Sequence, residues 1–257
     1  MYYFSAPLLY IMCLVVACQT YEGGFGGEPN GGEAHGGYAY CALATLQLLN
    51  RVNLIDRRAL RGWLTRRQQS FEGGFSGRAN KLVDGCYSFW QGAGMAILNL
   101  SDSSTSSGDE GQDLKGAFLH GITTEMVFDL LEDGTEDYVI DLNPIVRANG
   151  ASGGLLFDQS KLQRYILLCA QEPSGGLRDK PSKPRDFYHS CYNLSGLSVS
   201  QHVLSEDGVP VVYGHEKNVL NPSHPTLNIE VNKALKIIDH FQSKYGAPLH
   251  DKLLQEG

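Results

Sequence analysis

A short glycine motif recurs along this chain, and it constrains the fold more than any other feature. Residues 21–27 read Y-E-G-G-F-G-G, and residues 71–77 read F-E-G-G-F-S-G, fifty positions later. A third copy, P-S-G-G-L at residues 173–177, begins 102 residues after the second, which is about two further periods. A fixed period of this length indicates a repeat architecture, in which each unit buries its apolar face against its neighbours.

Each copy of the motif leads into a stretch of small and apolar residues that is long enough for a helix. The glycine pair lets the chain turn where side chains would clash. Apolar spacing then predicts helices over residues 35–49, 56–68, 86–99, 160–171, 188–203 and 228–245. In the second of these, Asp56 is the expected N-cap, with Leu60 and Trp63 facing inward. Alternating strand patterns are scarce, so the sequence predicts an all-α stack of helical hairpins.

Charge is distributed unevenly along a chain that is otherwise typical of a folded domain. Of 257 residues, 42% are hydrophobic and 19% are charged, which suits a sizeable core. The net charge of -7 argues against a nucleic-acid-binding protein. Residues 101–150 alone hold eleven acidic and two basic residues. We expect residues 101–157 to be a solvated, serine-rich insertion between repeats at 18–100 and repeats with C-terminal helices at 158–257.

Residues 1–17 form a separate apolar segment. The run 6–17 has the length of a signal-peptide core, but no basic residue precedes Arg51. It is shorter than the roughly 20 residues that span a bilayer, so we expect a buried helix and no membrane span. The six cysteines include no C-x-x-C pair and are interpreted as cytosolic thiols. A secreted glycoprotein, suggested by N-x-S/T matches at Asn99 and Asn193, is the alternative.

Asp84, Cys86 and His189 are the best candidates for a metal site. All three residue types ligate zinc, and a catalytic zinc site has three protein ligands and one open position. When the repeats are aligned, Asp84 matches Asp186, and His189 falls beside the position of Cys86. Because equivalent helix starts in a closed ring point into the same central space, we expect ligands from two repeats to converge there. An ordinary buried thiol is the alternative for Cys86.

Basic and aromatic side chains gather around the same turns. Arg78 and Lys81 precede Asp84, and His35 occupies the equivalent turn of the previous repeat. Cations near helix N-termini suit a phosphate or diphosphate, although surface solvation is the alternative for each. The aromatic residues that could line an apolar pocket, or simply form core, are Tyr38, Tyr87, Phe89, Trp90, Tyr188 and Tyr192.

Three segments of the chain resemble the β subunits of the protein farnesyltransferase family. They are residues 71–90 (FEGGFSGRANKLVDGCYSFW), 33–38 (EAHGGY) and 179–196 (DKPSKPRDFYHSCYNLSG). The resemblance runs from about Cys18 to Tyr245, and the acidic insertion is similar to that of plant-type subunits. It implies an α–α toroid, an α/α6 barrel of prenyltransferase repeats of which this chain holds the C-terminal part. It further implies a cytoplasmic heterodimer with an α subunit.

The activity that the resemblance implies is zinc-dependent transfer of a farnesyl group from farnesyl diphosphate to the cysteine of C-terminal C-a-a-X proteins. The zinc ligands of the family match Asp84, Cys86 and His189. The residues that hold the diphosphate match His35, Arg78, Lys81 and Tyr87, of which Lys81 and Tyr87 are also counted as catalytic. The wall of the isoprenoid cavity matches Gly37, Cys41, Trp90 and Tyr188, and a position near the isoprenoid tail matches Tyr192. A carboxylate associated with magnesium at the diphosphate matches Asp179.

Two alternatives remain beside this interpretation. The β subunit of geranylgeranyltransferase type I shares the fold and chemistry, but D-F-Y-H at residues 186–189 and V-D-G-C at 83–86 favour the farnesyl enzyme. A complete β subunit of the family has several more hairpins before the first repeat, where this chain has residues 1–17. We therefore expect an N-terminally shortened form, and the second alternative is a fragment that binds the α subunit without transferring lipid.

Overall fold

The computed structural model describes residues 5–49, 51–104, 156–202 and 209–245. The α-helices in these ranges are α1 (Ser5–Ala17), α2 (Gly36–Leu48), α3 (Arg57–Thr65), α4 (Tyr87–Ser104), α7 (Gln159–Tyr165), α8 (Phe187–His202) and α9 (Val231–Tyr245). The short helical segments in these ranges are the 3₁₀-helices η1 (Val52–Leu54) and η4 (Glu216–Asn218) and the π-helix η3 (Ile166–Ala170). Within the same ranges, extended segments pair only as isolated bridges. The all-α prediction is confirmed.

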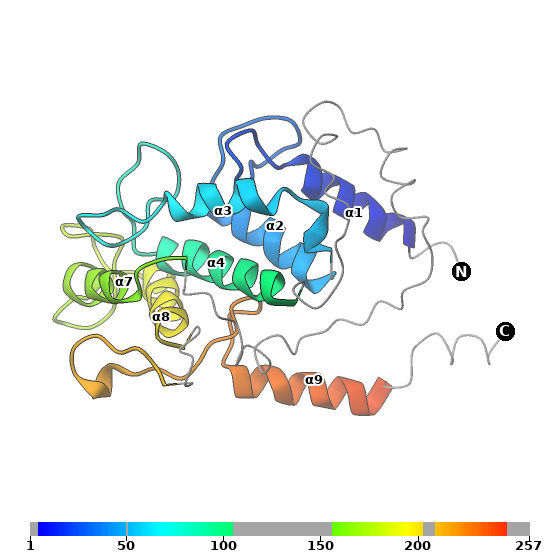
Figure 1. The fold of residues 1–257 in the computed structure, drawn as a ribbon. Coiled ribbons are helices and arrows are strands. Elements are labelled where there is room, and N and C mark those ends of the chain that lie inside the picture. The colour runs from blue at the N-terminus through cyan, green and yellow to red at the C-terminus, as the bar shows by residue number, and fades with distance from the viewer. Residues whose placement is uncertain (1–4, 50, 105–155, 203–208, 246–257) are drawn as a thin grey trace.

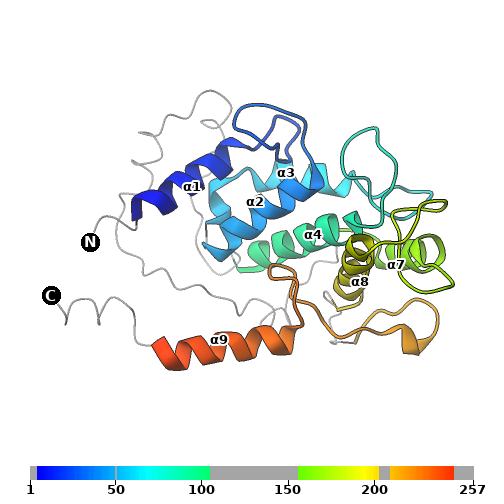
Figure 2. The same cartoon turned by 180° about the vertical axis from the view of Figure 1, so that it is seen from behind.

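The helices follow one another around an arc from α1 through α4 and α8 to α9 (Figures 1 and 2). α4 packs between α2 and α8, while α3 packs on the outside of α4 and α7 on α8. All six helices predicted from the sequence are present. Two helix ends differ most: α7 ends at Tyr165 and is continued by the π-helical η3, and α4 continues to Ser104, into the first residues of the predicted insertion. The rest of the predicted insertion, up to residue 155, lies outside the described residues.

The glycine motif forms the turn between an outer helix and the next inner helix. The first turn glycines, Gly23, Gly73 and Gly175, have φ angles of 99°, 83° and 95°, a region that favours glycine. A Cβ on Gly23 would lie 2.4 Å from the carbonyl oxygen of Ala59, and one on Gly73 would lie 2.6 Å from that of Lys161. The first two turns therefore rest directly on the outer helix of the following repeat, whereas a Cβ on Gly175 would meet nothing within 4 Å, so only its positive φ favours glycine there.

Glutamine side chains tie consecutive repeats together. The Gln68 amide donates to the carbonyl oxygens of Gly73 (2.8 Å) and Asp158 (2.9 Å) and accepts from the Asp158 backbone N–H (2.8 Å). Gln19 makes the same three bonds to Gly23 and Asp56 one repeat earlier. Asp56 and Asp158 are the N-caps of α3 and α7. Each glutamine therefore fixes where the next outer helix begins.

The apolar N-terminal segment occupies the position of an outer helix. α1 precedes the first glycine turn as α3 and η3 precede the later ones. Met12 and Val16 are buried, whereas Tyr10, Ile11 and Leu14 are exposed. The predicted buried helix is therefore buried along one face only. Among the described helices, none is both long and apolar enough to cross a bilayer.

A further copy of the loop that precedes an inner helix lies before α9. The bridge between Ser223 and Glu230 repeats the bridge between Ser76 and Val83. Asn80 and Asn228 occupy the same left-handed conformation inside the two loops, with φ of 55° and 52°. The sequence search missed this copy because it carries no glycine pair.

Candidate active site

A residue at or just before the start of α2, α4 and α8 caps the helix with its side chain, and the same side chain also contacts a second functional group. His35 Nδ1 accepts the Gly37 N–H at 3.1 Å. Asp84 Oδ1 accepts the Cys86 N–H at 2.9 Å, and Asp186 Oδ1 accepts the His189 N–H at 2.7 Å. These bonds satisfy backbone N–H groups that have no partner inside the helix. Candidate functional groups therefore collect at the N-terminal ends of α2, α4 and α8.

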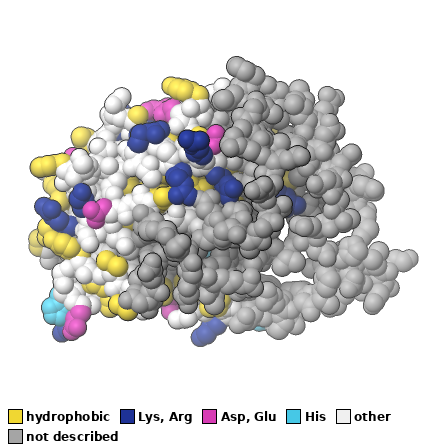
Figure 3. All heavy atoms as spheres, in the orientation of Figure 1, with side chains coloured by type: hydrophobic (Ala, Val, Ile, Leu, Met, Phe, Trp, Pro, Cys, Tyr) yellow, Lys and Arg dark blue, Asp and Glu magenta, His cyan; other side chains and the backbone are white. Residues whose placement is uncertain are grey.

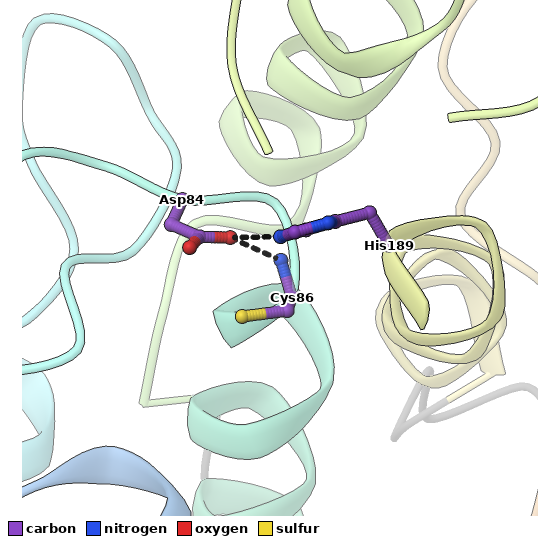
Figure 4. A group of neighbouring side chains, drawn as sticks. All are labelled: Asp84, Cys86 and His189. Carbon is purple, nitrogen blue, oxygen red and sulfur yellow. Dashed lines mark hydrogen bonds and ion pairs between the residues drawn. The ribbon is translucent and has the colours of Figure 1, made fainter. Parts of the chain in front are cut away.

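Asp84, Cys86 and His189 come together as the sequence predicts. Asp84 lies in the loop before α4, Cys86 directly precedes the first residue of that helix, and His189 reaches across from α8 (Figure 4). Their potential ligand atoms all lie within 4.8 Å of one another, and His189 Nε2 is 3.3 Å from Asp84 Oδ1. Tetrahedral zinc with bonds of about 2.0–2.1 Å to N and O places such atoms about 3.3 Å apart. The donor set and its spacing fit a zinc ion.

Asp186 orients the histidine of this cluster. Its Oδ2 lies 2.7 Å from His189 Nδ1, while Nε2 faces Asp84. A carboxylate on the far nitrogen of a metal-binding histidine sets the ring orientation and raises its basicity. The two bonds from His189 hold the pKa of Asp186 below its usual range. The sequence paired Asp186 with Asp84 by position and gave it no role, although the three-residue spacing to His189 was the available signal.

The Cys86 thiol is buried, 3% exposed, and its surroundings disfavour a bare thiolate. Burial raises the pKa of Cys86 strongly, and the Asp84 carboxylate adds to the rise, while a hydrogen bond from Tyr188 opposes it. A divalent cation at this position would reverse this balance, because it stabilises both the carboxylate and the thiolate. The electrostatics agree with the geometry in favouring a metal site.

The predicted diphosphate residues lie beside this cluster but are engaged in different ways. His35 Nε2 is 2.8 Å from the Tyr87 hydroxyl oxygen, which brings together two repeats. Arg78 Nη1 donates to Glu33 at 2.5 Å. Lys81 is exposed. The sequence did not predict the role of Glu33, whose carboxylate shares a cavity of about 530 Å³ with His35 and Arg78.

Glycines seat the Tyr87 ring. A Cβ on Gly77 would lie 2.0 Å from Tyr87 Cζ and 2.3 Å from its hydroxyl oxygen, and one on Gly36 would lie 3.2 Å from Cδ1. The Gly36 N–H also donates to the Gly77 carbonyl at 2.8 Å. The last glycine of the repeated motif is therefore required at this position to leave room for the phenol.

The predicted isoprenoid residues form an aromatic group next to the cluster. The rings of Trp90 and Tyr192 are 4.3 Å apart, and those of Tyr188 and Tyr192 are 4.8 Å apart. Trp90 Nε1 donates to the Tyr188 hydroxyl at 3.2 Å. Cys41 and Tyr188 are exposed, so this group presents an apolar surface rather than closed core. The N–H of Gly37 donates to His35 Nδ1 in the cap of α2.

The backbone of Asp179 is tied to the start of α4. Its carbonyl oxygen accepts the Gly85 N–H at 2.7 Å and the Tyr165 hydroxyl at 3.0 Å. Its carboxylate contacts the Lys180 ammonium. The structure therefore places the predicted magnesium carboxylate near the cluster, with a cation from its own chain already beside it.

Basic residues also gather away from this site. Several Lys or Arg side chains lie near one another on the surface over α3, whose sequence includes three arginines, Arg57, Arg58 and Arg61 (Figure 3). Arg67 stacks on Trp63 with its guanidinium carbon 5.1 Å from the ring centroid. These cations lie on or beside α3, which supplies none of the candidate site residues.

The chain belongs to the prenyltransferase α–α toroid family, whose domain model matches residues 9–229. The match includes part of the N-terminal segment for which the sequence showed no resemblance. The chain is 42% identical over 246 residues to the protein farnesyltransferase β subunit of Pisum sativum, covering 88% of this chain and 58% of that protein. It is 35% identical over 233 residues to that of Schizosaccharomyces pombe, covering 88% and 50%.

The fold also matches a solved structure, that of Candida albicans protein geranylgeranyltransferase-I, with a TM-score of 0.55 and 22% identity over 89% of this chain and 49% of the other. The resemblance to farnesyltransferase β subunits and the toroid fold class are thereby confirmed. The chain spans about half the length of the relatives that it matches.

Proposed function

We propose that this chain is the catalytic part of a protein farnesyltransferase β subunit that binds one zinc ion through Asp84, Cys86 and His189. The observation that carries the proposal is the convergence of these three side chains from two repeats, with ligand atoms within 4.8 Å. The similarity to farnesyltransferase β subunits supplies the reaction class. The proposed reaction forms a bond between a protein cysteine sulfur and C1 of farnesyl diphosphate while the bond from C1 to diphosphate breaks.

Each group of residues then has a task in that reaction. Zinc, when bound, lowers the pKa of a coordinated thiol and so favours the nucleophilic thiolate. Asp186 keeps His189 Nε2 directed at the ion. Arg78, Lys81 and Tyr87 donate to the diphosphate oxygens, where negative charge grows as the carbon–oxygen bond breaks. Trp90, Tyr188 and Tyr192 cover the isoprenoid, whose burial is worth about 0.8 kcal/mol per CH₂ group.

The remaining assignments concern partners and compartment. The Asp179 carboxylate, which contacts Lys180, would hold magnesium at the diphosphate. We place the chain in a heterodimer with a farnesyltransferase α subunit, acting on C-a-a-X proteins in the cytoplasm. All six cysteines, each of them in the described part of the chain, are free thiols, which suits a reducing compartment.

The decisive experiment measures zinc and prenyl transfer in a cysteine variant and its matched control. Cys86→Ala is expected to lose the zinc ion and transfer, measured by elemental analysis and with a C-a-a-X peptide in the presence of an α subunit. Cys169→Ala, which removes a half-buried cysteine on η3, is expected to keep both. Full zinc in Cys86→Ala would sink the assignment.

The choice of lipid and the activity of the chain are tested in the same assay. Farnesyl diphosphate and geranylgeranyl diphosphate are offered together, and we expect farnesyl product to dominate. Preferred geranylgeranyl transfer would identify a type I geranylgeranyltransferase subunit instead. Zinc binding and α-subunit binding without transfer of either lipid would identify a binding fragment.

A further inference from the structure

Asn193 is a fully buried polar residue that no step of the proposed function uses. Its side chain is 0% exposed, and it lies about one turn after His189 on α8. The sequence marks Asn193 as an N-x-S match for glycosylation, but an amide buried in this way has no room for a glycan. Burying an amide is costly unless the amide makes hydrogen bonds, so its partners indicate what it does.

Both hydrogens of the Asn193 amide are used, and they join two different segments. Nδ2 donates to the carbonyl oxygen of His189 at 2.8 Å and to that of Arg178 at 3.1 Å. Because carbonyl oxygens only accept, the atom that faces both of them must be the nitrogen. The first bond lies within α8, and the second crosses to the loop that precedes this helix.

The same loop holds the residue between the other two candidate zinc ligands. The carbonyl oxygen of Asp179, the residue after Arg178, accepts the Gly85 N–H at 2.7 Å. Gly85 separates Asp84 from Cys86 in the sequence. A continuous chain of hydrogen bonds therefore runs from α8, through this loop, to the backbone between the two ligands.

Gly85 leaves the space that the Asn193 amide fills. A Cβ on Gly85 would lie 2.4 Å from Asn193 Nδ2, 2.5 Å from its Oδ1 and 2.8 Å from the Arg178 carbonyl oxygen. The distances to the amide are far below the roughly 3.5 Å of an ordinary contact. Gly85 does not have the positive φ of the turn glycines, so space rather than backbone conformation requires glycine here. The amide is therefore packed directly against the backbone that links Asp84 and Cys86.

We infer that Asn193 is a positioning residue of the candidate zinc site, which fixes the helix that carries His189 against the segment that carries the other two ligands. The inference rests on the proposed function, because it concerns the ion that these ligands would hold. His189 Nε2 and Asp84 Oδ1 are 3.3 Å apart, so a small shift between the two segments would spoil the spacing. Asp186 orients the His189 ring, whereas Asn193 holds the backbone from which that ring extends.

Two variants of Asn193 and one control separate positioning from general stability. Asn193→Ala removes both hydrogen bonds. Asn193→Ser removes only the bond to Arg178, because a serine hydroxyl in a helix can donate to the carbonyl four residues earlier. Gln201→Ala is the control, about two turns further along α8. Gln201 is 1% exposed, and its amide also makes two hydrogen bonds, to the backbone of Asn218 and Leu220.

Metal binding is measured by titrating cobalt(II) into the full chain. Cobalt(II) occupies tetrahedral zinc sites, and its visible absorption depends on the arrangement of its ligands. Asn193→Ala and Asn193→Ser are each expected to bind cobalt about tenfold more weakly than the parent, with shifted absorption bands, as for the loss of an outer partner of a metal ligand. Gln201→Ala is expected to keep the affinity and spectrum of the parent, although urea unfolding is expected to show that it loses as much stability as Asn193→Ala.

Cobalt affinity and a spectrum like those of the parent in either Asn193 variant would overturn the inference. An equal change in Gln201→Ala would overturn it as well, because the effect would then come from lost stability. Asn193→Ser keeps a buried donor, so it decides the question if Asn193→Ala does not fold. Cys86→Ala distinguishes the two proposals. A parent chain that bound no cobalt, or a Cys86→Ala chain that bound it as tightly as the parent, would refute the proposed zinc site itself, whereas normal binding by the Asn193 variants would refute the positioning role alone.

Discussion

Replacing Gly77 by alanine tests whether the repeated glycine motif serves the site as well as the fold. A Cβ at this position would lie 2.0 Å from Tyr87 Cζ and 2.3 Å from the hydroxyl oxygen. An ordinary carbon contact needs about 3.5 Å, so the ring would have to move by about 1.5 Å. A shift of that size removes the Tyr87 oxygen from its 2.8 Å bond to His35.

The expected cost to stability is moderate and the cost to transfer is large. Losing one hydrogen bond costs about 1 kcal/mol, and overpacking costs about 1–3 kcal/mol in a tight core. The contact is with the far end of a half-buried side chain that can swing outward, so we expect about 1–2 kcal/mol in total. Because the Tyr87 hydroxyl is displaced from the site, we expect kcat to fall about a hundredfold, the loss typical of removing one donor to the developing charge.

Gly92→Ala is the matched control for this substitution. It lies inside α4, and its Cβ would meet nothing closer than Phe157 Cζ at 3.9 Å. Alanine inside a helix is favoured over glycine by up to about 1 kcal/mol, so this variant is expected to be slightly more stable and fully active. Stability is measured by urea unfolding and activity by farnesyl transfer. If Gly77→Ala kept the activity of the parent, the seating argument would be wrong.

Three further predictions follow from the same contacts. Gln68→Ala is expected to lower the free energy of unfolding by about 2 kcal/mol in urea, because it removes two hydrogen bonds to the next repeat and one within its own turn. Gln171→Ala, at an exposed equivalent position, is expected to change the free energy of unfolding little. Asp186→Asn keeps the cap of α8 but weakens the hydrogen bond to His189 Nδ1. Zinc affinity, measured by competition with a chelator, is expected to fall by about tenfold to a hundredfold. Zinc affinity is expected to rise about tenfold per pH unit near neutrality, because burial raises the pKa of Cys86 and its thiol must release one proton when the ion binds. An affinity that does not change with pH would show that Cys86 is not a ligand.

The sequence predicted what depends on local periodicity. The glycine pairs place the turns, the apolar spacing places the helices, and the aligned copies bring Asp84 and Cys86 toward His189. It did not predict contacts that join a side chain to distant backbone. Gln68 reaches Asp158 across 90 residues, and no pattern in the sequence pairs them.

Other features escaped prediction for a different physical reason. The loop before α9 shares a bridge and a left-handed asparagine, Asn228, with the earlier loop that holds Asn80, but no glycine pair precedes it, so the glycine motif could not reveal it. The magnesium role of Asp179, the isoprenoid role of Cys41 and the diphosphate role of Lys81 remain predictions from the family resemblance, since the structure places these residues without showing a ligand.

The position of the site follows from the way each inner helix begins. His35, Asp84 and Asp186 occupy equivalent positions, and the side chain of each both caps its helix and contacts a functional partner. Those partners are Tyr87, the His189 ring nitrogen Nε2 and the ring nitrogen Nδ1, respectively. A residue that satisfies both demands must carry polar atoms on a short side chain, as aspartate and histidine do. The three side chains that cap these helices therefore also bring functional groups from three repeats together.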